Sequence, residues 1–270
     1  MSGARHYMRG AGGIVLREAL RFLHQRERFV AALVRPLVWL VVFAAGFRNV
    51  LGVSIVEPYE TYILYEVYIV PGLIGMVQLF NGMQSSLSMV YDREMGNMRT
   101  LLVSPLPRWY LLLSKLLAGT AVSLFQVYAF LIFAVLLGVD LPLMGFVTVL
   151  PALILSGLML GALGMLLSSF IKQLENFAGI MNFVIFPMFF LSTALYPLWR
   201  MQEASIVLYR ICAVNPFTHA VEMIRHALYQ QLDPLAVLAV LGALVVFAVG
   251  AVYGYDPSRG MLTRRGGPGG

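Results

Sequence analysis

Residues 91–115, with the sequence YDREMGNMRTLLVSPLPRWYLLLSK, form a polar interruption between two long apolar stretches. The interruption carries six charged side chains and two prolines, Pro105 and Pro107, which mark the end of one helix and the start of the next. The chain on both sides of it is almost free of charge, as expected of segments inside a membrane. Residues 91–115 are therefore where a partner in the surrounding water can contact the embedded part.

The composition assigns the chain to the polytopic membrane proteins. Of its 270 residues, 60% are hydrophobic and only 12% are charged, whereas soluble proteins carry about 25% charged residues. Too few polar side chains remain for a surface that faces water. The net charge of +6 is explained by an excess of basic residues on cytoplasmic loops, so we expect no nucleic-acid partner. The single cysteine, Cys212, excludes an internal disulfide.

Six apolar stretches predict six membrane-spanning helices, because about 20 apolar residues cross the hydrocarbon core. The predicted spans are residues 29–47, 67–91, 116–139, 143–170, 177–198 and 234–255. With both termini in the cytoplasm, fifteen of the nineteen basic residues fall on cytoplasmic segments, and only Arg48, Arg200, Arg210 and Arg225 fall outside. This bias predicts an all-α protein with six transmembrane helices and both termini cytoplasmic.

Residues 14–28 precede the first span and predict an amphipathic helix with one apolar and one basic face. Such a helix lies in the lipid headgroup layer, although it can also pack on protein. The chain then divides into a basic arm with this helix (1–28), a membrane domain (29–255) and a disordered cytoplasmic tail (256–270). Arg35, in the first span, is interpreted as a depth anchor whose charged head reaches the surface, with a role as substrate ligand as the alternative.

The segment between the fifth and sixth spans predicts two short helices rather than a plain loop. Residues 204–214 are apolar but too short to cross a membrane. Asn215 followed by Pro216 is typical of an N-cap and a first helical position, and apolar residues follow at helical spacing. Glu222 and Arg225 lie on another face of this second helix. We expect both helices to dip into the outer leaflet or to cap the bundle.

The fourth predicted span carries a stripe of small residues. Gly157 and Gly161 form a GxxxG pattern, which Gly164 extends. Small residues at this spacing let two helices approach closely. We therefore interpret the stripe as a packing surface and not as a binding site.

Several motifs of ATP-binding and hydrolytic sites are absent from the sequence. There is no GxxxxGK[ST] loop, no HExxH and no GxSxG. Ion-coupled transporters usually carry acidic residues or histidines at mid-membrane, and here the nearest candidate, Glu66, lies at the edge of the second span. These absences argue against a membrane hydrolase and weaken a proton-coupled carrier. They suit a gate that another protein drives.

The polar interruption contains a short predicted helix, residues 94–103. Ser104 and Pro105 end it, because the residue before a proline is pushed out of helical geometry. The helix has an apolar side and a charged side, so it offers a surface that a partner can push. A basic turn at the membrane surface is the alternative.

Two motifs, in this order, resemble the ABC-2 type transporter permeases, the membrane subunits of ABC exporters. Residues 92–105, DREMGNMRTLLVSP, with Lys115 downstream, are similar to the family pattern E-R-E-x-G-T-x-E-x-L-x-x-[ST]-P and its following lysine. The residue pair 196–197 (YP), followed by residues 215–225, is similar to a proline-rich turn and N-P-[LF]-T-x5-[IL]-R. The resemblance covers nearly the whole chain. It departs from the family at residues 97–99, where many members have a threonine and an acidic residue.

The resemblance implies a transport subunit that works with separately encoded ATPases. Two such permeases, as a homodimer or with a paralogue, would pair with two cytoplasmic ABC ATPase subunits that bind ATP and magnesium. This chain itself would be no enzyme and would hold no cofactor. ATP-driven closure of the ATPases would switch a cavity between inward- and outward-facing states in the inner membrane of a bacterium, where membrane lipid surrounds the chain.

The resemblance also implies roles for particular residues. The helix at 94–103 would be the coupling helix seated in the ATPase, with the helix at 14–28 as the connecting helix beside it. The coupling residues would be Glu94, Gly96, Arg99, Leu101, Leu102, Ser104 and Pro105. The outer gate would comprise Tyr196, Pro197, Asn215, Pro216, Phe217 and Arg225. The polar residues that would face the cavity are Glu66, Gln78, Asn81 and Gln126, with hydrogen bonding between helices as the alternative.

Two other functions stay open at this point. A secondary carrier would show an inverted repeat or need an acid at mid-membrane. A membrane-embedded enzyme or scaffold would act without any ATPase. The nearly uncharged spans favour an apolar or amphipathic substrate, and the direction of transport, export, comes from the resemblance alone.

Overall fold

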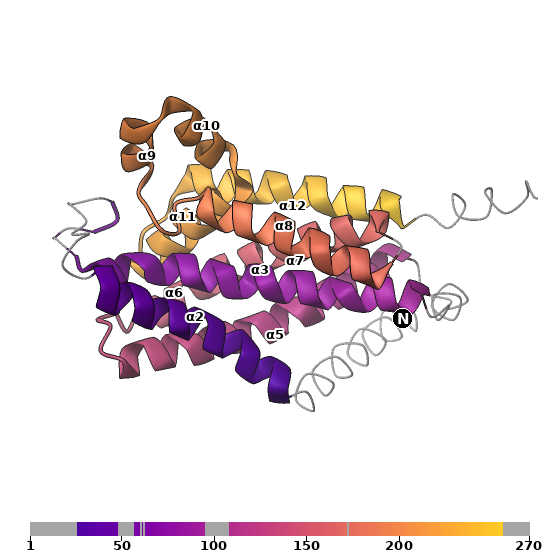
Figure 1. The fold of residues 1–270 in the computed structure, drawn as a ribbon, viewed down its shortest axis with the longest axis horizontal. Coiled ribbons are helices and arrows are strands. Elements are labelled where there is room, and N and C mark those ends of the chain that lie inside the picture. The colour runs from indigo at the N-terminus through magenta and orange to yellow at the C-terminus, as the bar shows by residue number, and fades with distance from the viewer. Residues whose placement is uncertain are drawn as a thin grey trace, which may run out of the picture.

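The computed structural model describes residues 26–47, 57–59, 61, 63–94, 108–171 and 173–255, and its regular elements in these ranges are all helices. The long helices lie side by side along one axis (Figure 1): α2 (Arg26–Phe47), α3 (Tyr65–Glu94), α5 (Arg108–Leu136), α7 (Leu150–Phe170), α8 (Leu174–Phe190) and α12 (Pro234–Gly254). Shorter helices gather at one end: α6 (Gly145–Thr148), α9 (Leu198–Ala204), α10 (Ile206–Val214) and α11 (Pro216–Leu228). The all-α prediction is confirmed for these residues. Residues 1–25 and 256–270 lie outside them.

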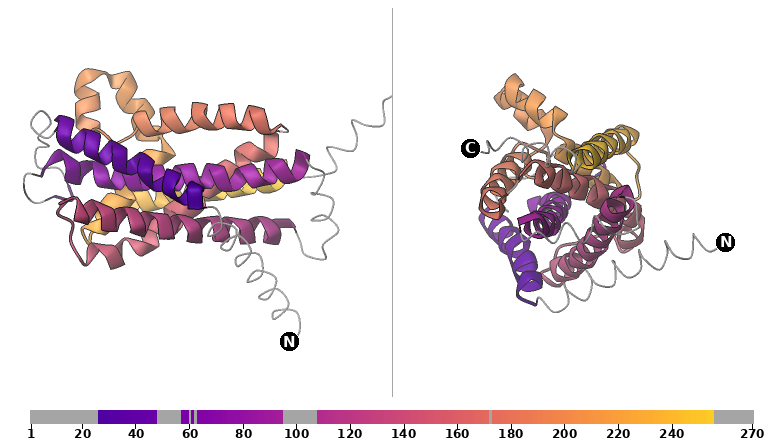
Figure 2. Two further views of the ribbon diagram at one scale, coloured as in Figure 1. Left: turned by 60° about the horizontal axis from the view of Figure 1, so that its bottom comes forward. Right: turned by 90° about the vertical axis from the view of Figure 1, so that its right-hand side faces the viewer.

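Helix α3 occupies the centre of the bundle, and the other long helices surround it (Figure 2, right). It contacts α2, α5, α7, α8 and α11. Its first half is apolar and buried, with Ile69, Val70 and Leu73 completely inaccessible to solvent. Its second half carries amide and hydroxyl side chains, which lipid does not satisfy. The amides of Gln78 and Asn81 bond to neighbouring helices, whereas the hydroxyls of Ser86 and Ser88 bond to backbone oxygens of α3 itself.

Helices α3 and α7 pack closely because glycines face each other where the helices cross. A Cβ added to Gly164 would lie 2.7 Å from the backbone oxygen of Gly82, and one added to Gly82 would lie 2.9 Å from the oxygen of Leu160. No side chain fits at such distances, so the two backbones touch directly. The stripe of small residues is thus a packing surface, as predicted, and its partner is the central helix.

Three helical stretches in the described residues are long and apolar enough to cross a membrane: Trp109–Leu136, Gly145–Phe170 and Pro234–Gly254. The apolar stretches in α2 and α8 are shorter, covering Leu33–Phe43 and Leu174–Phe190. Helix α3 has 30 residues and is about 45 Å long, but the polar side chains of its second half set it apart. By length and composition, several helices of this bundle are therefore suited to a membrane.

The prediction for the fifth span, residues 177–198, is wrong at its end. Helix α8 ends at Phe190, and residues 191–197 leave the helix. The reason is tertiary: the amide nitrogen of Asn215 donates hydrogen bonds to the backbone oxygens of Met188 and Leu191. These bonds satisfy carbonyls that a longer helix would satisfy internally.

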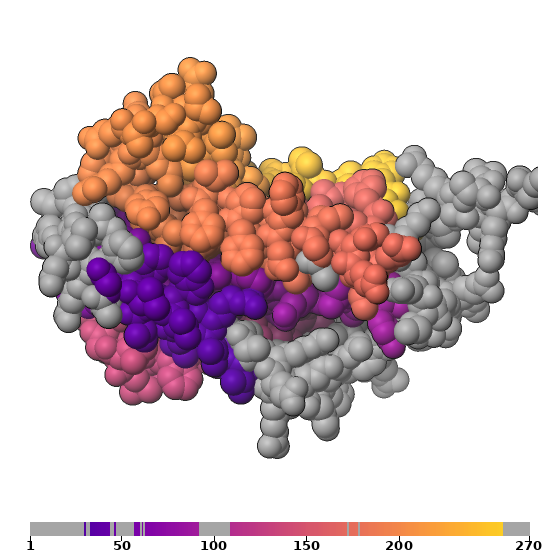
Figure 3. All heavy atoms as spheres, viewed as in Figure 1, coloured from indigo at the N-terminus to yellow at the C-terminus, as the bar shows by residue number. Residues whose placement is uncertain are grey.

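Helices α9 and α10 form a lobe that projects from one end of the bundle (Figure 3). Helix α9 has no buried residue, and much of the apolar surface of α10 is exposed, including Val207 and Val214. Helix α11, in contrast, packs against α3, α7 and α12. The two short helices predicted at 204–214 and from Asn215 onward correspond to α10 and α11, and α9 precedes them.

Candidate functional site

Most of the coupling residues predicted from the sequence lie outside the described ranges. Helix α3 ends at Glu94 and α5 begins at Arg108, so residues 95–107 join these two helices at one end of the bundle. The joining segment contains Gly96, Arg99, Leu101, Leu102, Ser104 and Pro105. Their coupling role stays a prediction.

Arg225 of α11 is the largest completely enclosed polar side chain in the described residues, with 1% of its surface exposed. Its guanidinium pairs with the carboxylate of Glu222, one turn earlier on the same helix. Its Nη2 donates a hydrogen bond to the backbone oxygen of Thr193 at 2.9 Å. Its Cζ also lies 4.2 Å from the centre of the Tyr68 ring in α3. Burying a charge is costly unless it is paired, and these contacts supply the pairing.

Two tyrosines of α3 bind the same non-helical segment, residues 191–197. The hydroxyl of Tyr68 donates to the oxygen of Thr193 at 3.1 Å, and that of Tyr65 donates to the oxygen of Leu195 at 2.9 Å. We refer to Tyr65, Tyr68, Thr193, Glu222 and Arg225 as the Arg225 cluster. The cluster joins three elements that are far apart in sequence: α3, the segment after α8, and α11.

Asn215 begins α11 and fastens it to the end of α8. Its Oδ1 accepts a hydrogen bond from the backbone nitrogen of Phe217 at 3.0 Å, which is the N-cap arrangement that the Asn-Pro pair predicts. Phe217 is completely buried and packs against the ring of Phe189, with 6.2 Å between ring centres. A Cβ on Gly75 of α3 would lie 3.0 Å from this ring. The start of α11 is therefore fixed to both α8 and α3.

The structure separates the predicted gate residues into two groups. Asn215, Phe217 and Arg225 are inside the bundle and bind other elements. Tyr196, in contrast, is exposed on the surface, and Pro197 is the residue before α9. Pro216 opens α11 at its first position.

Sequence reasoning missed the residues that surround Arg225. It placed Glu222 and Arg225 on a separate face of α11 and did not predict that Arg225 is buried. The available signal was the pair Tyr65 and Tyr68, three residues apart at the start of α3, which presents two hydroxyls on one helical face. The partner, the backbone of Thr193, cannot be read from side-chain chemistry, because any residue type offers a carbonyl oxygen.

Tyr59, in the loop before α3, covers the cluster. Its ring centre lies 4.8 Å from that of Tyr229 and 6.5 Å from that of Tyr68, and only 4% of the side chain is exposed. Burial raises the pKa of the Tyr59 hydroxyl to about 12, while the charge of Arg225 opposes this shift. Tyr59 is therefore neutral at physiological pH.

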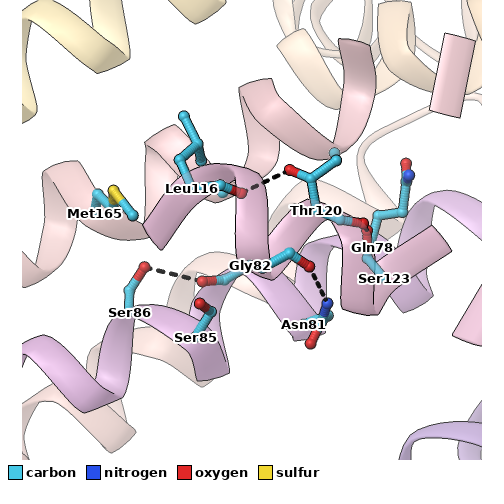
Figure 4. A pocket seen from close by; sticks show the side chains of 12 residues that line it. Gln78, Asn81, Gly82, Ser85, Ser86, Leu116, Thr120, Ser123 and Met165 are labelled. Atoms are coloured by element: carbon cyan, nitrogen blue, oxygen red, sulfur yellow. Dashed lines mark hydrogen bonds between the residues drawn. The ribbon is translucent and has the colours of Figure 1, made fainter. Parts of the chain in front are cut away.

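A small polar cavity lies where α3, α5 and α7 meet (Figure 4). Gln78 donates from Nε2 to the oxygen of Leu153 at 2.7 Å, and its Oε1 accepts from Ser156 at 2.6 Å. Asn81 donates from Nδ2 to the oxygen of Gly119 at 3.0 Å. The cavity has a volume of about 10 Å³, which is room for about one water molecule. In this structure both amides thus form hydrogen bonds between helices. From the sequence, such bonds were expected as the alternative to lining a substrate cavity.

The other two predicted polar residues lie elsewhere. Glu66 is in the first turn of α3, twelve residues before Gln78, or about 18 Å along the helix. Gln126 lies on α5 and is 2% exposed, and its Oε1 has no hydrogen-bond partner in the part of the chain that the structure describes. The structure therefore brings together Gln78 and Asn81 only.

The fold is that of a helical membrane protein in which one end of the bundle is closed by short helices, and comparison with known proteins defines its family. The sequence pattern of the ABC-2 type transporter family matches residues 12–229. Since this is most of the chain, the protein belongs to the ABC-2 type transporter family.

Individual relatives agree with this assignment. The chain is 29% identical over 199 residues to "Putative transport permease ycf38" of Cyanophora paradoxa, covering 73% of this chain and 66% of the relative. It is 29% identical over 223 residues to the ycf38 protein of Porphyra purpurea, covering 82% and 74%. It is 30% identical over 165 residues to "Probable multidrug ABC transporter permease YbhR" of Escherichia coli strain K12, covering 60% and 43%.

The protein is accordingly the membrane permease subunit of an ABC transporter. It is a multi-pass membrane protein and a transport subunit. Its relatives occur in a bacterium and in algae. The matched region spans less than half of YbhR.

Proposed function

We propose that this permease forms the substrate pathway of an ATP-driven exporter, together with a second copy or a paralogue. The ATP and magnesium sites would lie on separate cytoplasmic ATPase subunits. The family supports the need for such an ATPase, because a permease subunit has no energy source of its own. The relative named as a probable multidrug transporter permease is consistent with export of an apolar or amphipathic compound.

In this proposal the chain crosses the membrane six times, with both termini in the cytoplasm of a bacterium. The spans are α2, α3, α5, the α6–α7 unit, α8 and α12. Residues 1–28 form the basic arm and connecting helix, residues 29–255 the membrane domain, and residues 256–270 the cytoplasmic tail. The excess of basic residues on one side supports this orientation. Helix α2 already begins at Arg26, so the boundary at 28 falls inside a helix.

The observation that carries the proposal is the Arg225 cluster. Three hydrogen bonds to backbone oxygens and one ring contact fasten α11, residues 191–197 and the central helix together at one end of the bundle, and an ion pair within α11 neutralises the arginine. A pathway that opens at this end must break these contacts. The cluster therefore has the properties of a closed outer gate, to which Asn215 and Phe217 belong as well.

Energy would enter at the opposite end of α3. Glu94 is the last residue of α3, and residues 95–103 come between α3 and α5 in the chain. A force on this coupling helix acts directly on α3, which is the helix that holds the gate. Glu94, Arg99 and Leu101 are the residues whose replacement should uncouple ATP hydrolysis from transport.

Purification of the tagged permease in detergent tests the partner. We expect a stoichiometric ABC ATPase to co-purify and to hydrolyse ATP. When residues 94–103 are replaced by a Gly/Ser linker, we expect the co-purified ATPase and its ATP hydrolysis to be lost. A matched control replaces α9, residues 198–204, by a linker of similar kind, because α9 is a short helix with no buried residue. This control should keep the ATPase.

Two results would contradict the proposal. If the permease purifies without any ATPase yet transports substrate in vesicles, it is a secondary carrier. If both linker variants retain the ATPase equally, residues 94–103 are not the coupling helix.

A further inference from the structure

A second cavity lies between α2 and α3, and Asn81 lines both this cavity and the one in Figure 4. Its volume is about 30 Å³. Its walls combine one cation, Arg35, with the amides of Asn81 and Gln84 and with the apolar side chains of Met76, Val77 and Phe80. It therefore differs from an ordinary apolar gap between membrane helices.

The cation of this cavity lies near the middle of α3 along the axis of the bundle. The Cζ of Arg35 is 4.0 Å from the centre of the Phe80 ring. Phe80 is fourteen residues from Glu66 and fourteen from Glu94 on α3, or about 21 Å along the helix from either. A depth anchor would instead direct its head toward a helix end. The position of Arg35 favours the alternative, a ligand for substrate.

No acidic residue pairs with Arg35 in the part of the chain that the structure describes. Its side chain is also exposed. A cation at membrane depth is costly, and such residues usually mark substrate or ion pathways. The ring of Phe80 compensates only in part, so an anion in the cavity would complete the pairing.

The neighbours of Arg35 indicate what kind of anion fits. A guanidinium forms a planar fork that matches carboxylate, phosphate or sulfate oxygens. Gln84, one turn after Phe80, is half-buried and adds an amide donor, and Asn81 lies beside it. On α2, Val34 and Val38 are about half exposed next to Arg35. They extend an apolar surface from the charged position.

We propose that Arg35, with Asn81 and Gln84, binds the anionic head of an amphiphilic molecule whose alkyl part lies along the exposed face of α2. That this molecule is the transported substrate rests on the export function proposed above, whereas the binding itself does not. The same chemistry belongs to a resident anionic phospholipid, so the test has to distinguish these two sources.

Binding is measured by quenching of Trp39, which lies one helical turn after Arg35 on α2. Trp109→Phe and Trp199→Phe leave it as the sole tryptophan. The full chain, in a non-ionic detergent, is titrated with bromododecyl phosphate and, separately, with bromododecyl trimethylammonium. We expect the phosphate to bind at least tenfold more tightly. We expect Arg35→Gln to remove this preference, Arg35→Lys to keep part of it, and Arg210→Gln, at an exposed site on α10, to leave it unchanged.

Two results would overturn the site. One is equal binding of the two probes by the parent protein. The other is an unchanged preference for phosphate in Arg35→Gln. Because the readout needs no ATPase, it does not depend on the assembly of the transporter.

The source of the anion is tested on the complete transporter in phosphatidylcholine nanodiscs. Stimulation of ATP hydrolysis by dodecyl phosphate, lost in Arg35→Gln while basal hydrolysis persists, supports a substrate site. Displacement of the probe by phosphatidylglycerol without any stimulation overturns the substrate role and assigns the site to a resident lipid. If inorganic phosphate at the same concentration displaces the probe equally well, the site binds a free anion, and the proposal that it binds an amphiphilic molecule is overturned. If no ATPase assembles but the phosphate preference remains, the proposed export function fails and the binding site does not.

Discussion

Arg225 holds a full charge in a position that solvent does not reach, and the cost of that burial is offset by a small set of contacts. Glu222 supplies the countercharge and is 19% exposed, whereas Arg225 is 1% exposed. Thr193 contributes only its backbone, and Tyr68 contributes both its ring and its hydroxyl. Each contact comes from a different element. Loss of the arginine therefore leaves the Glu222 carboxylate without its countercharge, and it leaves the Thr193 oxygen with only the hydrogen bond from Tyr68.

Arg225→Met should destabilise the protein by about 3–5 kcal/mol, because it leaves a carboxylate without its partner inside the bundle. Unfolding in detergent, followed by circular dichroism, measures the change. Arg210→Met is the matched control, since Arg210 is exposed on α10, and it should change the free energy of unfolding by less than about 0.5 kcal/mol. Equal effects of the two substitutions would contradict a structural role for the Arg225 cluster.

Tyr59 predicts a pH dependence at the alkaline end. Its folded pKa of about 12 is above the ordinary value of about 10 for tyrosine. The folded state therefore holds the proton more tightly, so the stabilisation is fully present below about pH 10 and is lost as pH rises through about 12. The loss is about 3 kcal/mol at about 1.4 kcal/mol per pH unit. Unfolding curves from pH 9 to 12 should fall less steeply for Tyr59→Phe than for the parent protein, and identical slopes would exclude this origin.

For single residues, the sequence identified the residues with a structural role, but it did not predict most of their contacts. Asn215 was expected to cap α11, and it does, because an N-cap depends on neighbours in sequence. Its two bonds to the end of α8 involve residues more than twenty positions away. No local pattern encodes them. The same holds for Arg225, whose burial depends on where α3 lies.

Among the elements, α11 depends on Asn215 in two separable ways. The oxygen of the side chain caps the helix, and the nitrogen donates to Met188 and Leu191. Asn215→Ala loses both and should cost about 2–3 kcal/mol. Asn215→Asp keeps the cap but directs a carboxylate at two carbonyl oxygens, so it should destabilise at least as much. Thermal unfolding of the two variants decides the point: a stable Asp variant would show that capping alone holds α11.

The contact between α3 and α7 tolerates no side chain at its closest point. Gly164→Ala places a methyl group against the backbone oxygen of Gly82 at 2.7 Å, and the helices have to separate. We expect a destabilisation of about 1–3 kcal/mol, as for other overpacked sites. Gly242→Ala on α12 is the control, because nothing lies within 4 Å of its added Cβ. Melting temperatures of the two variants should differ clearly, and a stable Gly164→Ala would show that the helices are not in backbone contact.

The sequence predicted the bounds of a helix well where an uninterrupted apolar run sets the length of that helix. The α12 prediction, 234–255, agrees with Pro234–Gly254 within one residue. The end of α8 was wrong because Asn215 and the tyrosines of α3 bind the following backbone. For the polar cavity, the sequence identified Gln78 and Asn81 but not their partners, which are backbone oxygens of α7 and α5 and the hydroxyl of Ser156.

For the molecule as a whole, the orientation in the membrane is open to a direct test. Gln202 on α9 and Gln173, just before α8, are both exposed. Helix α9 and the start of α8 lie at opposite ends of the bundle (Figure 1). Starting from Cys212→Ser, which removes the single native cysteine, each is replaced by cysteine. A membrane-impermeant maleimide should label Gln202→Cys on intact cells, and Gln173→Cys only after the membrane is opened. The reverse pattern would invert the proposed topology.

Helix α3 is continuous, with Pro71 inside its second turn, and it reaches from the proposed gate to the proposed coupling helix. Gly82, where it touches α7 without intervening side chains, lies fourteen residues from Tyr68 and twelve from Glu94. If α3 pivots there, the two arms of the lever are about 21 Å and 18 Å long. A sideways displacement of the Glu94 end would then move Tyr68 in the opposite direction by a similar distance. The mechanical advantage is close to one, so a stroke of a few ångströms at the ATPase end is enough to separate Tyr68 from the Thr193 oxygen.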